Sequence, residues 1–300
     1  MKRDYVQTQS LMFTLYGDYI YPREGWAWTA SLIRMLEVLG VSDQATRSAL
    51  SRMSGHGWLK PSKRGRLSLY TLTAKGRRLM EEGTRRIYSE PSSSWDGQWR
   101  VVVYSLPEER RHLREALRRR LEWLGFGRLG PGTWISPHDQ QADLEQILDD
   151  VGVRRFVDRF IGAWVGTSNQ DLVSRCWDLK DLGRRYSAFI NNWRPKFERH
   201  LRSESDGETT NAADCFVNRF WIIHDYRAFA QADPGLPCEL LPVDWRGDEA
   251  RQLFLQYHDA LTAPASNFID TALNQGIDLD EHPIQSAETV AAGSRASVSA

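Results

Sequence analysis

The clearest candidates for chemistry are polar and basic side chains that repeat at helical spacing within residues 44–55. They are Gln44, Arg47, Ser48, Ser51 and Arg52. A helix fits the major groove of DNA, where glutamine and arginine bind the edges of adenine and guanine, and hydroxyl groups suit phosphate or base edges. The apolar residues of the segment fall on its other side, namely Ala45, Ala49, Leu50 and Met53. We therefore predict that the polar face contacts DNA, with a solvated basic face as the alternative.

A second basic segment follows this helix at the distance of a wing. Residues 58–60 and 67–72 have the composition of two strands, and the polar turn between them contains Gly65. The basic side chains of this predicted hairpin are Lys60, Lys63, Arg64 and Arg66. Together with the helix, the hairpin favours DNA binding over a solvated surface, and we expect it to contact the backbone or the minor groove.

The elements that must position these residues are helices and one hairpin. Apolar spacing predicts helices over residues 9–21, with Ser10 available as N-cap, and over residues 29–39, ending at Gly40. A tight turn over residues 41–43 leads into the helix described above, and a last helix follows the hairpin from Thr73 to Ile87. This order is that of a winged helix-turn-helix domain.

The middle of the chain predicts a second fold. A strand over residues 99–105, a helix over 108–124, two short strands within 126–136, a helix over 142–151 and a strand within 155–165 follow one another. The order βαββαβ is that of a ferredoxin-like domain. The arginines of its first helix, residues 110–120, could form a second nucleic-acid patch. We favour ion pairs with Glu108, Glu115 and Glu122, which lie three or four residues from arginines.

The last third of the chain predicts mainly helices, including one that ends before Pro195 and two over residues 215–230 and 248–268. The fold class is therefore α+β. We expect a winged helix-turn-helix domain over residues 1–90, a ferredoxin-like dimerisation domain over 95–168 and a helical effector or regulatory domain over 169–275. We predict an exposed loop at residues 203–208, a linker at 91–94 and a disordered tail at 276–300.

Aromatic and basic residues of the helical part could line a pocket for an aromatic or anionic effector. They are Trp221, His224, Tyr226, Arg227 and Trp245. Packing in an ordinary core is the alternative, and the sequence does not decide between the two.

No set of residues points to catalysis, and we predict that the protein is not an enzyme and holds no metal or cofactor. The group His224, Asp225 and Glu239 lacks the spacing of a specific metal site. The glycines of residues 125–130 match GxGxxG, but they follow a helix and not a strand, which favours a turn. A nucleic-acid-processing enzyme that uses Asp96 and Asp139 is the main alternative, and an enzyme that uses acyl-CoA is the third.

Composition fits a globular chain with a divided charge. The 300 residues are 41% hydrophobic and 26% charged, and residues 1–7 lack the apolar run of a signal peptide, so we expect a cytoplasmic protein with no membrane contact. The three cysteines, Cys176, Cys215 and Cys238, are widely spaced, which favours free thiols. Residues 1–90 hold 15 basic and 8 acidic side chains, whereas residues 200–300 hold 6 basic and 16 acidic side chains. A basic first part favours a polyanionic partner.

With these residues assembled, the sequence resembles the PaaX family of bacterial transcriptional repressors of aromatic-acid catabolism. The most specific stretches are residues 10–19, residues 44–53 with Gly57-Trp58-Leu59, and His224-Asp225-Tyr226-Arg227 with residues 233–237 and Leu240-Leu241-Pro242. The resemblance covers nearly all of residues 9–270.

The resemblance implies a dimeric repressor that binds an inverted-repeat operator in double-stranded DNA and is released by an aryl-CoA thioester, phenylacetyl-CoA in the type member. It places Gln44, Arg47, Ser48, Ser51 and Arg52 on the recognition helix, and Lys63, Arg64 and Arg66 on the wing. The middle domain is similar to the CRISPR-associated nuclease of spacer acquisition. Those nucleases carry an aspartate at the end of the first strand, where this chain has Tyr104-Ser105, so we expect no nuclease activity.

Overall fold

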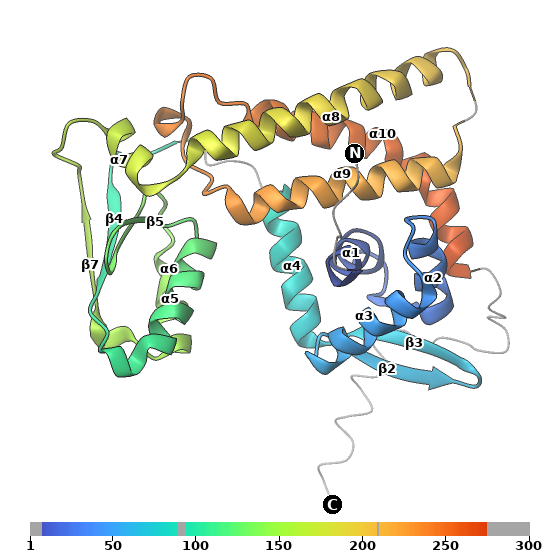
Figure 1. Ribbon diagram of the computed structural model, residues 1–300, viewed down its shortest axis with the longest axis horizontal. Helices are drawn as coiled ribbons and strands as arrows, with labels where there is room; N and C mark the ends of the chain where they lie inside the picture. Colours follow the sequence, from blue (N-terminus) through green and yellow to red (C-terminus); the bar gives the residue numbers. More distant parts are fainter. Residues whose placement is uncertain (1–7, 89–93, 209, 275–300) are drawn as a thin grey trace, which may run out of the picture. The chain divides into compact units, whose positions relative to one another are not determined.

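The computed structural model describes residues 8–88, 94–208 and 210–274 of the chain (Figure 1). The predicted linker residues 91–93 and the predicted tail from residue 276 lie outside them. The chain divides into two compact units. The described residues of the first unit are 8–88, 196–208, 210–225 and 254–274, and those of the second are 94–195 and 226–253. Helices and two sheets are both present, as the α+β class requires.

The first unit begins with helices that pack against a small three-stranded sheet. Its elements are α1 (Thr8–Leu15), a π-helical turn η1 (Tyr16–Ile20), β1 (Trp26–Trp28), α2 (Thr29–Glu37), α3 (Asp43–Gly55), β2 (Leu59–Arg64), β3 (Leu67–Leu72) and α4 (Ala74–Tyr88). The strands pair antiparallel in the order β1-β3-β2. The helix expected over residues 9–21 is present, but the prediction of Ser10 as its N-cap is wrong, because Ser10 lies inside α1.

Helix α3 has a defined start and a buried side. The Ser42 hydroxyl accepts a hydrogen bond from the backbone N–H of Ala45, which satisfies one of the free donors of the first turn. The buried residues of α3 are Thr46, Ala49, Leu50 and Met53, and the helix contacts α1 and α2. The turn before it uses Gly40 at a φ of 83°, as predicted from the sequence.

The hairpin is longer and its turn is tighter than expected. Residues 61–64, predicted as part of the turn, continue strand β2, and Arg64 pairs with Leu67, so the turn consists of Gly65 and Arg66. Gly65 has a φ of 55°, a value that suits glycine in a two-residue hairpin turn. Pro61 fits within β2 because β2 is an edge strand, so one side of its backbone needs no partner.

The second unit contains an antiparallel sheet and its two helices. Its first elements are β4 (Trp99–Tyr104), the 3-10 turn η2 (Glu108–Arg110), α5 (Arg111–Trp123), β5 (Gly127–Gly130), β6 (Thr133–Ser136), α6 (Gln141–Val151), the 3-10 turn η3 (Arg154–Phe156) and β7 (Val157–Gly162). The strand order is β5-β6-β4-β7, with all neighbours antiparallel. Val102, Leu117, Leu121, Trp134 and Leu148 belong to its core. The GxGxxG stretch follows α5, as expected, but the prediction that it forms a turn is wrong for most of it, because Gly127–Gly130 form strand β5.

The remaining elements are mostly long helices. They are α7 (Asn169–Cys176), α8 (Leu179–Ser205), α9 (Ala212–Ala232), the 3-10 turn η4 (Cys238–Leu240) and α10 (Gly247–Asn274). The prediction that a helix ends before Pro195 is wrong, because α8 continues through it. Residues 203–205 also belong to α8 and not to the predicted loop. None of the helices in the described part of the chain is long and apolar enough to span a membrane.

Candidate DNA-binding surface

One face of α3 presents every polar residue that the sequence singles out. The side chains of Gln44, Arg47, Ser48, Ser51 and Arg52 are all exposed. Their exposure follows from the amphipathic pattern, because Thr46, Ala49, Leu50 and Met53 form the buried side, while Ala45 is half-buried. The surface therefore offers amide, guanidinium and hydroxyl groups along one helix, and these groups can donate to base edges and phosphates.

An acidic residue shares this face, because Asp43, which was predicted to belong to the preceding turn, is the first residue of α3. The Arg47 Nε donates to Asp43 Oδ1 at 2.5 Å, and Nη2 donates to Oδ2 at 3.3 Å. Asp43 lies in the first turn of α3, where a negative charge is favourable to the helix. Any base or phosphate that Arg47 binds must therefore compete with this carboxylate.

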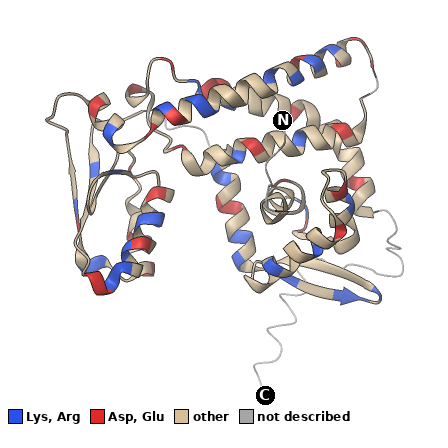
Figure 2. Cartoon of the chain, in the orientation of Figure 1, with Lys and Arg blue, Asp and Glu red and all other residues tan. Residues whose placement is uncertain are grey.

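The β2–β3 hairpin adds basic side chains at its tip (Figure 2). Near the turn, Lys63 and Arg66 are exposed and Arg64 is half-buried, whereas the exposed Lys60 lies at the other end of the hairpin, where it pairs with Thr71. Lys63 pairs with Ser68 in the sheet register, one residue pair from the two-residue turn. The hairpin thus places positive charge on a short projecting element, where phosphate contacts need little desolvation.

Close backbone contacts fix the connection between α3 and the hairpin. Gly57, at a φ of 71°, reverses the chain, and its carbonyl accepts a hydrogen bond from the Thr73 hydroxyl at 2.7 Å. Lys75 Nζ donates to the carbonyl of His56 at 3.0 Å. At Gly76, a Cβ would lie 2.2 Å from the carbonyl oxygen of Trp58. Helix α4 is therefore held against the end of α3. His56 and Lys75 are exposed beside the predicted surface, and no pattern in the sequence singled them out.

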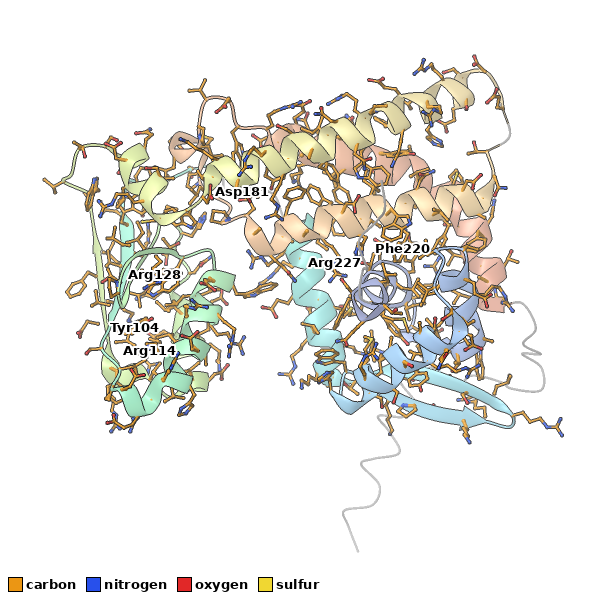
Figure 3. All side chains as sticks on the ribbon, viewed as in Figure 1. Tyr104, Arg114, Arg128, Asp181, Phe220 and Arg227 are labelled. Carbon is orange, nitrogen blue, oxygen red and sulfur yellow. The ribbon has the colours of Figure 1, made fainter. Side chains whose placement is uncertain are left out.

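The residues predicted to bind an effector are not brought together in one unit. Trp221 and His224 belong to the first unit, whereas Tyr226, Arg227 and Trp245 belong to the second (Arg227 is labelled in Figure 3). His224 Nδ1 is 2.9 Å from the Thr14 hydroxyl, and the Trp221 ring packs edge-on against the His224 ring.

Within the second unit, the aromatic members of the predicted pocket pack against other rings. Tyr226 lies edge-on to Phe189, and Trp245 lies edge-on to Tyr186. Burial lowers the pKa of Arg227. Tyr226 is buried by these contacts, whereas Trp245 is half-buried.

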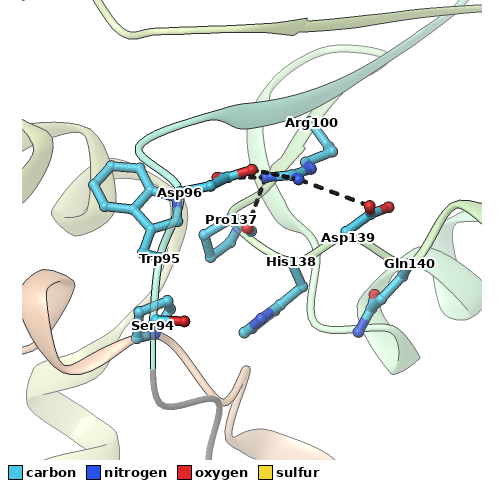
Figure 4. Close-up of a pocket in the computed structure, with 9 residues that line it drawn as sticks. Ser94, Trp95, Asp96, Arg100, Pro137, His138, Asp139 and Gln140 are labelled. Atoms are coloured by element: carbon cyan, nitrogen blue, oxygen red, sulfur yellow. Dashed lines mark hydrogen bonds and ion pairs between the residues drawn. The ribbon is translucent and has the colours of Figure 1, made fainter.

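The carboxylates proposed for the alternative enzyme do meet in a pocket of the second unit (Figure 4). This open pocket has a volume of about 590 Å³, and its lining includes Trp95, Asp96, Arg100, His138 and Asp139. Arg100 Nη2 is 2.7 Å from Asp96 Oδ2 and 4.0 Å from Asp139 Oδ2.

The chemistry of this pocket does not favour metal-dependent cleavage. The hydrogen bond from Arg100 lowers the pKa of Asp96 to about 2, so the guanidinium takes the place that a cation would occupy beside this carboxylate. Burial lowers the pKa of His138, whose Nε2 is 3.2 Å from the carbonyl oxygen of Pro234. The first strand of the unit, β4, ends at Tyr104 (Figure 3), a neutral residue that does not add a carboxylate. The backbone N–H of Tyr104 donates to the carbonyl of Gly132.

Arginines of α5 pair with all three predicted glutamates, but only the two pairs of Arg118 have the expected spacing of three or four residues. Arg114 Nη2 lies 2.9 Å from Glu108, and Arg118 Nε lies 3.4 Å from Glu115 and 3.8 Å from Glu122. These pairs neutralise part of the predicted second nucleic-acid patch.

Models of one protein family match three successive stretches of the chain. The model described as PaaX-like protein matches residues 7–76, the PaaX protein central Cas2-like domain matches residues 92–173, and the PaaX-like protein C-terminal domain matches residues 177–271.

Two known proteins are similar over most of the chain. The transcriptional repressor PaaX of Escherichia coli (strain K12) is 34% identical over 268 residues, which cover 88% of this chain and 83% of the repressor. The solved structure of an uncharacterized protein from Mycobacterium tuberculosis has a TM-score of 0.53 and 24% identity, covering 87% of this chain and 98% of that chain. The latter similarity concerns the fold alone.

Proposed function

Because the chain belongs to the PaaX family of transcriptional repressors, we propose that it represses transcription by binding operator DNA through α3 and the β2–β3 hairpin. In this proposal the elements from α1 to α4 form a winged helix-turn-helix domain, with α3 as the recognition helix and the hairpin as the wing. The helix order and the strand order β1-β3-β2 support it. The protein acts in the cytoplasm, without catalysis.

The observation that carries this proposal is the complete separation of the two sides of α3. All five polar residues selected from the sequence are exposed, and the four buried residues hold the helix against its neighbours. A helix presented in this way can enter the major groove without unfolding or rearranging. The basic hairpin beside it supplies sequence-independent affinity through phosphate contacts.

The repressor acts as a homodimer that forms through the second unit. The βαββαβ order and the antiparallel strand order β5-β6-β4-β7 support a ferredoxin-like fold for this part. Its edge strand β7 exposes Phe160 and Ile161, which retain 60% and 63% of their accessible surface. Apolar side chains on an edge strand favour pairing with another chain. A dimer with two-fold symmetry then fits an inverted-repeat operator.

The effector of this proposal is an aryl-CoA thioester, such as phenylacetyl-CoA, whose binding releases the operator of an operon for aromatic-acid degradation. The basis of this proposal is the similarity of the chain to a repressor named PaaX and to the PaaX-like C-terminal domain. His224 and Arg227 remain candidates for effector contacts, with Trp221, Tyr226 and Trp245. Trp221 and Tyr226 are buried, so an effector that contacts them requires α9 to rearrange, whereas Trp245 is half-buried and lies outside the helices.

Fluorescence anisotropy on a duplex from upstream of the protein's own gene tests the proposal. We expect tight binding that weakens as salt rises, and release on addition of phenylacetyl-CoA but not of free CoA. If no aryl-CoA thioester weakens binding, the proposed class of effector is wrong. If the protein binds an unrelated duplex with equal affinity, the proposal that it is an operator-specific repressor is wrong. The control is the same anisotropy titration with a duplex of the same length and a scrambled sequence.

A further inference from the structure

A buried polar network in the first unit connects η1 and α4 to α9 and α10. Asp18 in η1 forms an ion pair with Arg219 of α9, and Arg219 Nη2 lies 2.8 Å from His258 Nε2 of α10. Tyr88, at the end of α4, donates its hydroxyl hydrogen to Asp18 Oδ1 at 2.9 Å and lies 3.2 Å from His258 Nε2. Four elements that are distant in sequence therefore meet at one set of hydrogen bonds.

The burial of this network makes its charge balance important. Only 9% of the side-chain surface of both Asp18 and Arg219 is exposed. Burial alone would raise the pKa of Asp18, but His258 and Arg219 together hold it below its ordinary value. Arg219 also lies over the ring of Tyr19, 4.8 Å from its centre. Removing Asp18 or Arg219 would thus leave the other charge buried without its ion-pair partner.

Two further polar links join the same helices. His224 of α9 contacts the Thr14 hydroxyl of α1, one turn before the network. At the other end, Arg34 and Ser31 of α2 donate to the carbonyls of Ala272 and Leu273, which belong to the last turn of α10. These carbonyls have no partner within their own helix, so α2 satisfies the end of α10.

We infer that the Asp18–Arg219–His258–Tyr88 network couples α3 to α9 and α10, so that a displacement of these two helices changes the position or stability of the DNA-binding helix. The functional half of this inference rests on the proposed function. The route is short, because η1 directly continues α1 and α1 contacts α3. A π-helical turn such as η1 often marks a functional position within a helix.

Hydrogen exchange on the free, full-length protein tests the coupling without DNA. In Arg219→Met, we expect exchange to become at least about tenfold faster in residues 8–20 and also in residues 43–55, since Asp18 loses its buried partner. The strands β4 and β6 of the second unit should stay within about twofold. In the double variant Asp18→Asn/Arg219→Met, which has no unpaired charge, protection of residues 43–55 should largely return.

The matched control is Leu261→Ala, which creates a cavity in the same part of α10 without touching a charge. Faster exchange confined to residues 8–20 and α9 in Arg219→Met, with residues 43–55 unchanged, would overturn the inference. The inference would also be overturned if Leu261→Ala accelerated exchange in residues 43–55 as much as Arg219→Met does. If Arg219→Met does not fold, Arg219→Lys keeps the charge with fewer donors, and the same segments decide the outcome.

A DNA-binding measurement on the same variants separates this inference from the proposed function. We expect Arg219→Met to lose at least about tenfold in operator affinity and the double variant to recover most of it. If wild type binds no DNA, the proposed function is wrong, whereas the exchange results still decide the coupling. If wild type binds DNA and Arg219→Met binds equally well, the coupling is wrong and the proposed function stands.

Discussion

Asp43 and Arg47 form an ion pair across one turn of α3, with 2.5 Å between Arg47 Nε and Asp43 Oδ1. Half or more of each side chain remains exposed, so the pair lies on the surface proposed to contact DNA. A pair this exposed contributes little to stability. Its effect is to restrict the guanidinium of Arg47 to one direction while no DNA is bound, and mutants of either residue should reveal this restriction.

We predict that Arg47→Ala lowers operator affinity by about 1–3 kcal/mol and relaxes specificity at one base pair, because alanine cannot form the bidentate hydrogen bonds of arginine to a base. Asp43→Asn should raise operator affinity, since it removes the carboxylate that competes with DNA for Arg47. Anisotropy titrations on operator and on single-base variants measure both. An equal decrease in affinity for every sequence in Arg47→Ala would instead indicate that Arg47 binds a phosphate.

The wing predicts a different response. Replacement of Lys63 or Arg66 by Ala should weaken binding to all duplexes equally and reduce the slope of log K against log salt by about one for each phosphate that the variant no longer neutralises. Both side chains are exposed at or beside the two-residue turn, so their removal should not affect folding. Titrations at four salt concentrations give the slope, and an unchanged slope would remove the hairpin from the interface.

Local patterns in the sequence were sufficient for most elements of the first unit. The alternation of polar and buried residues in α3 and the glycine at its preceding turn depend only on near neighbours, and both predictions are confirmed. The hairpin turn was misplaced because Pro61 and Lys63 resemble turn residues, whereas the edge position of β2 tolerates them.

Predictions that depend on distant contacts were less successful. Pro195 did not end α8, since a long packed helix tolerates the absence of one hydrogen bond. The five predicted effector residues divide between two units, and their role stays a prediction. Asp18 and Arg219 are 201 residues apart, so no local pattern could indicate their ion pair. The DNA-binding residues remain a prediction.

Gly76 provides a test of the packing that holds α4 against the end of α3. We predict that Gly76→Ala destabilises the protein by about 1–3 kcal/mol, because its Cβ would meet the Trp58 carbonyl oxygen, a backbone atom that cannot move easily. Gly83 lies in the same helix with no atom within 4 Å of an added Cβ. Gly83→Ala should therefore be neutral or stabilise by up to about 1 kcal/mol. Urea denaturation of both variants measures the difference.

The buried carboxylate of Asp18 predicts a loss of stability in acid. The pKa of Asp18 is lower in the folded protein than in the unfolded chain, where an aspartate has a pKa of about 4. The stabilisation is thus fully present above about pH 4 and is lost as the pH falls through the lower, folded value. Free energies of unfolding between pH 7 and pH 3 should fall less steeply in Asp18→Asn than in wild type. Parallel curves for the two proteins would contradict this assignment.

The exposed edge of β7 predicts the oligomeric state. Phe160→Lys and Ile161→Lys should each raise the dimer dissociation constant by at least about tenfold, because lysine on either face of an edge strand opposes pairing with another strand. Val243 is equally apolar and fully exposed, but it lies outside the sheet. Val243→Lys should therefore leave the dimer unchanged. Sedimentation velocity over a concentration series measures all three variants, and a dimer that withstands both β7 substitutions would place the interface on another surface.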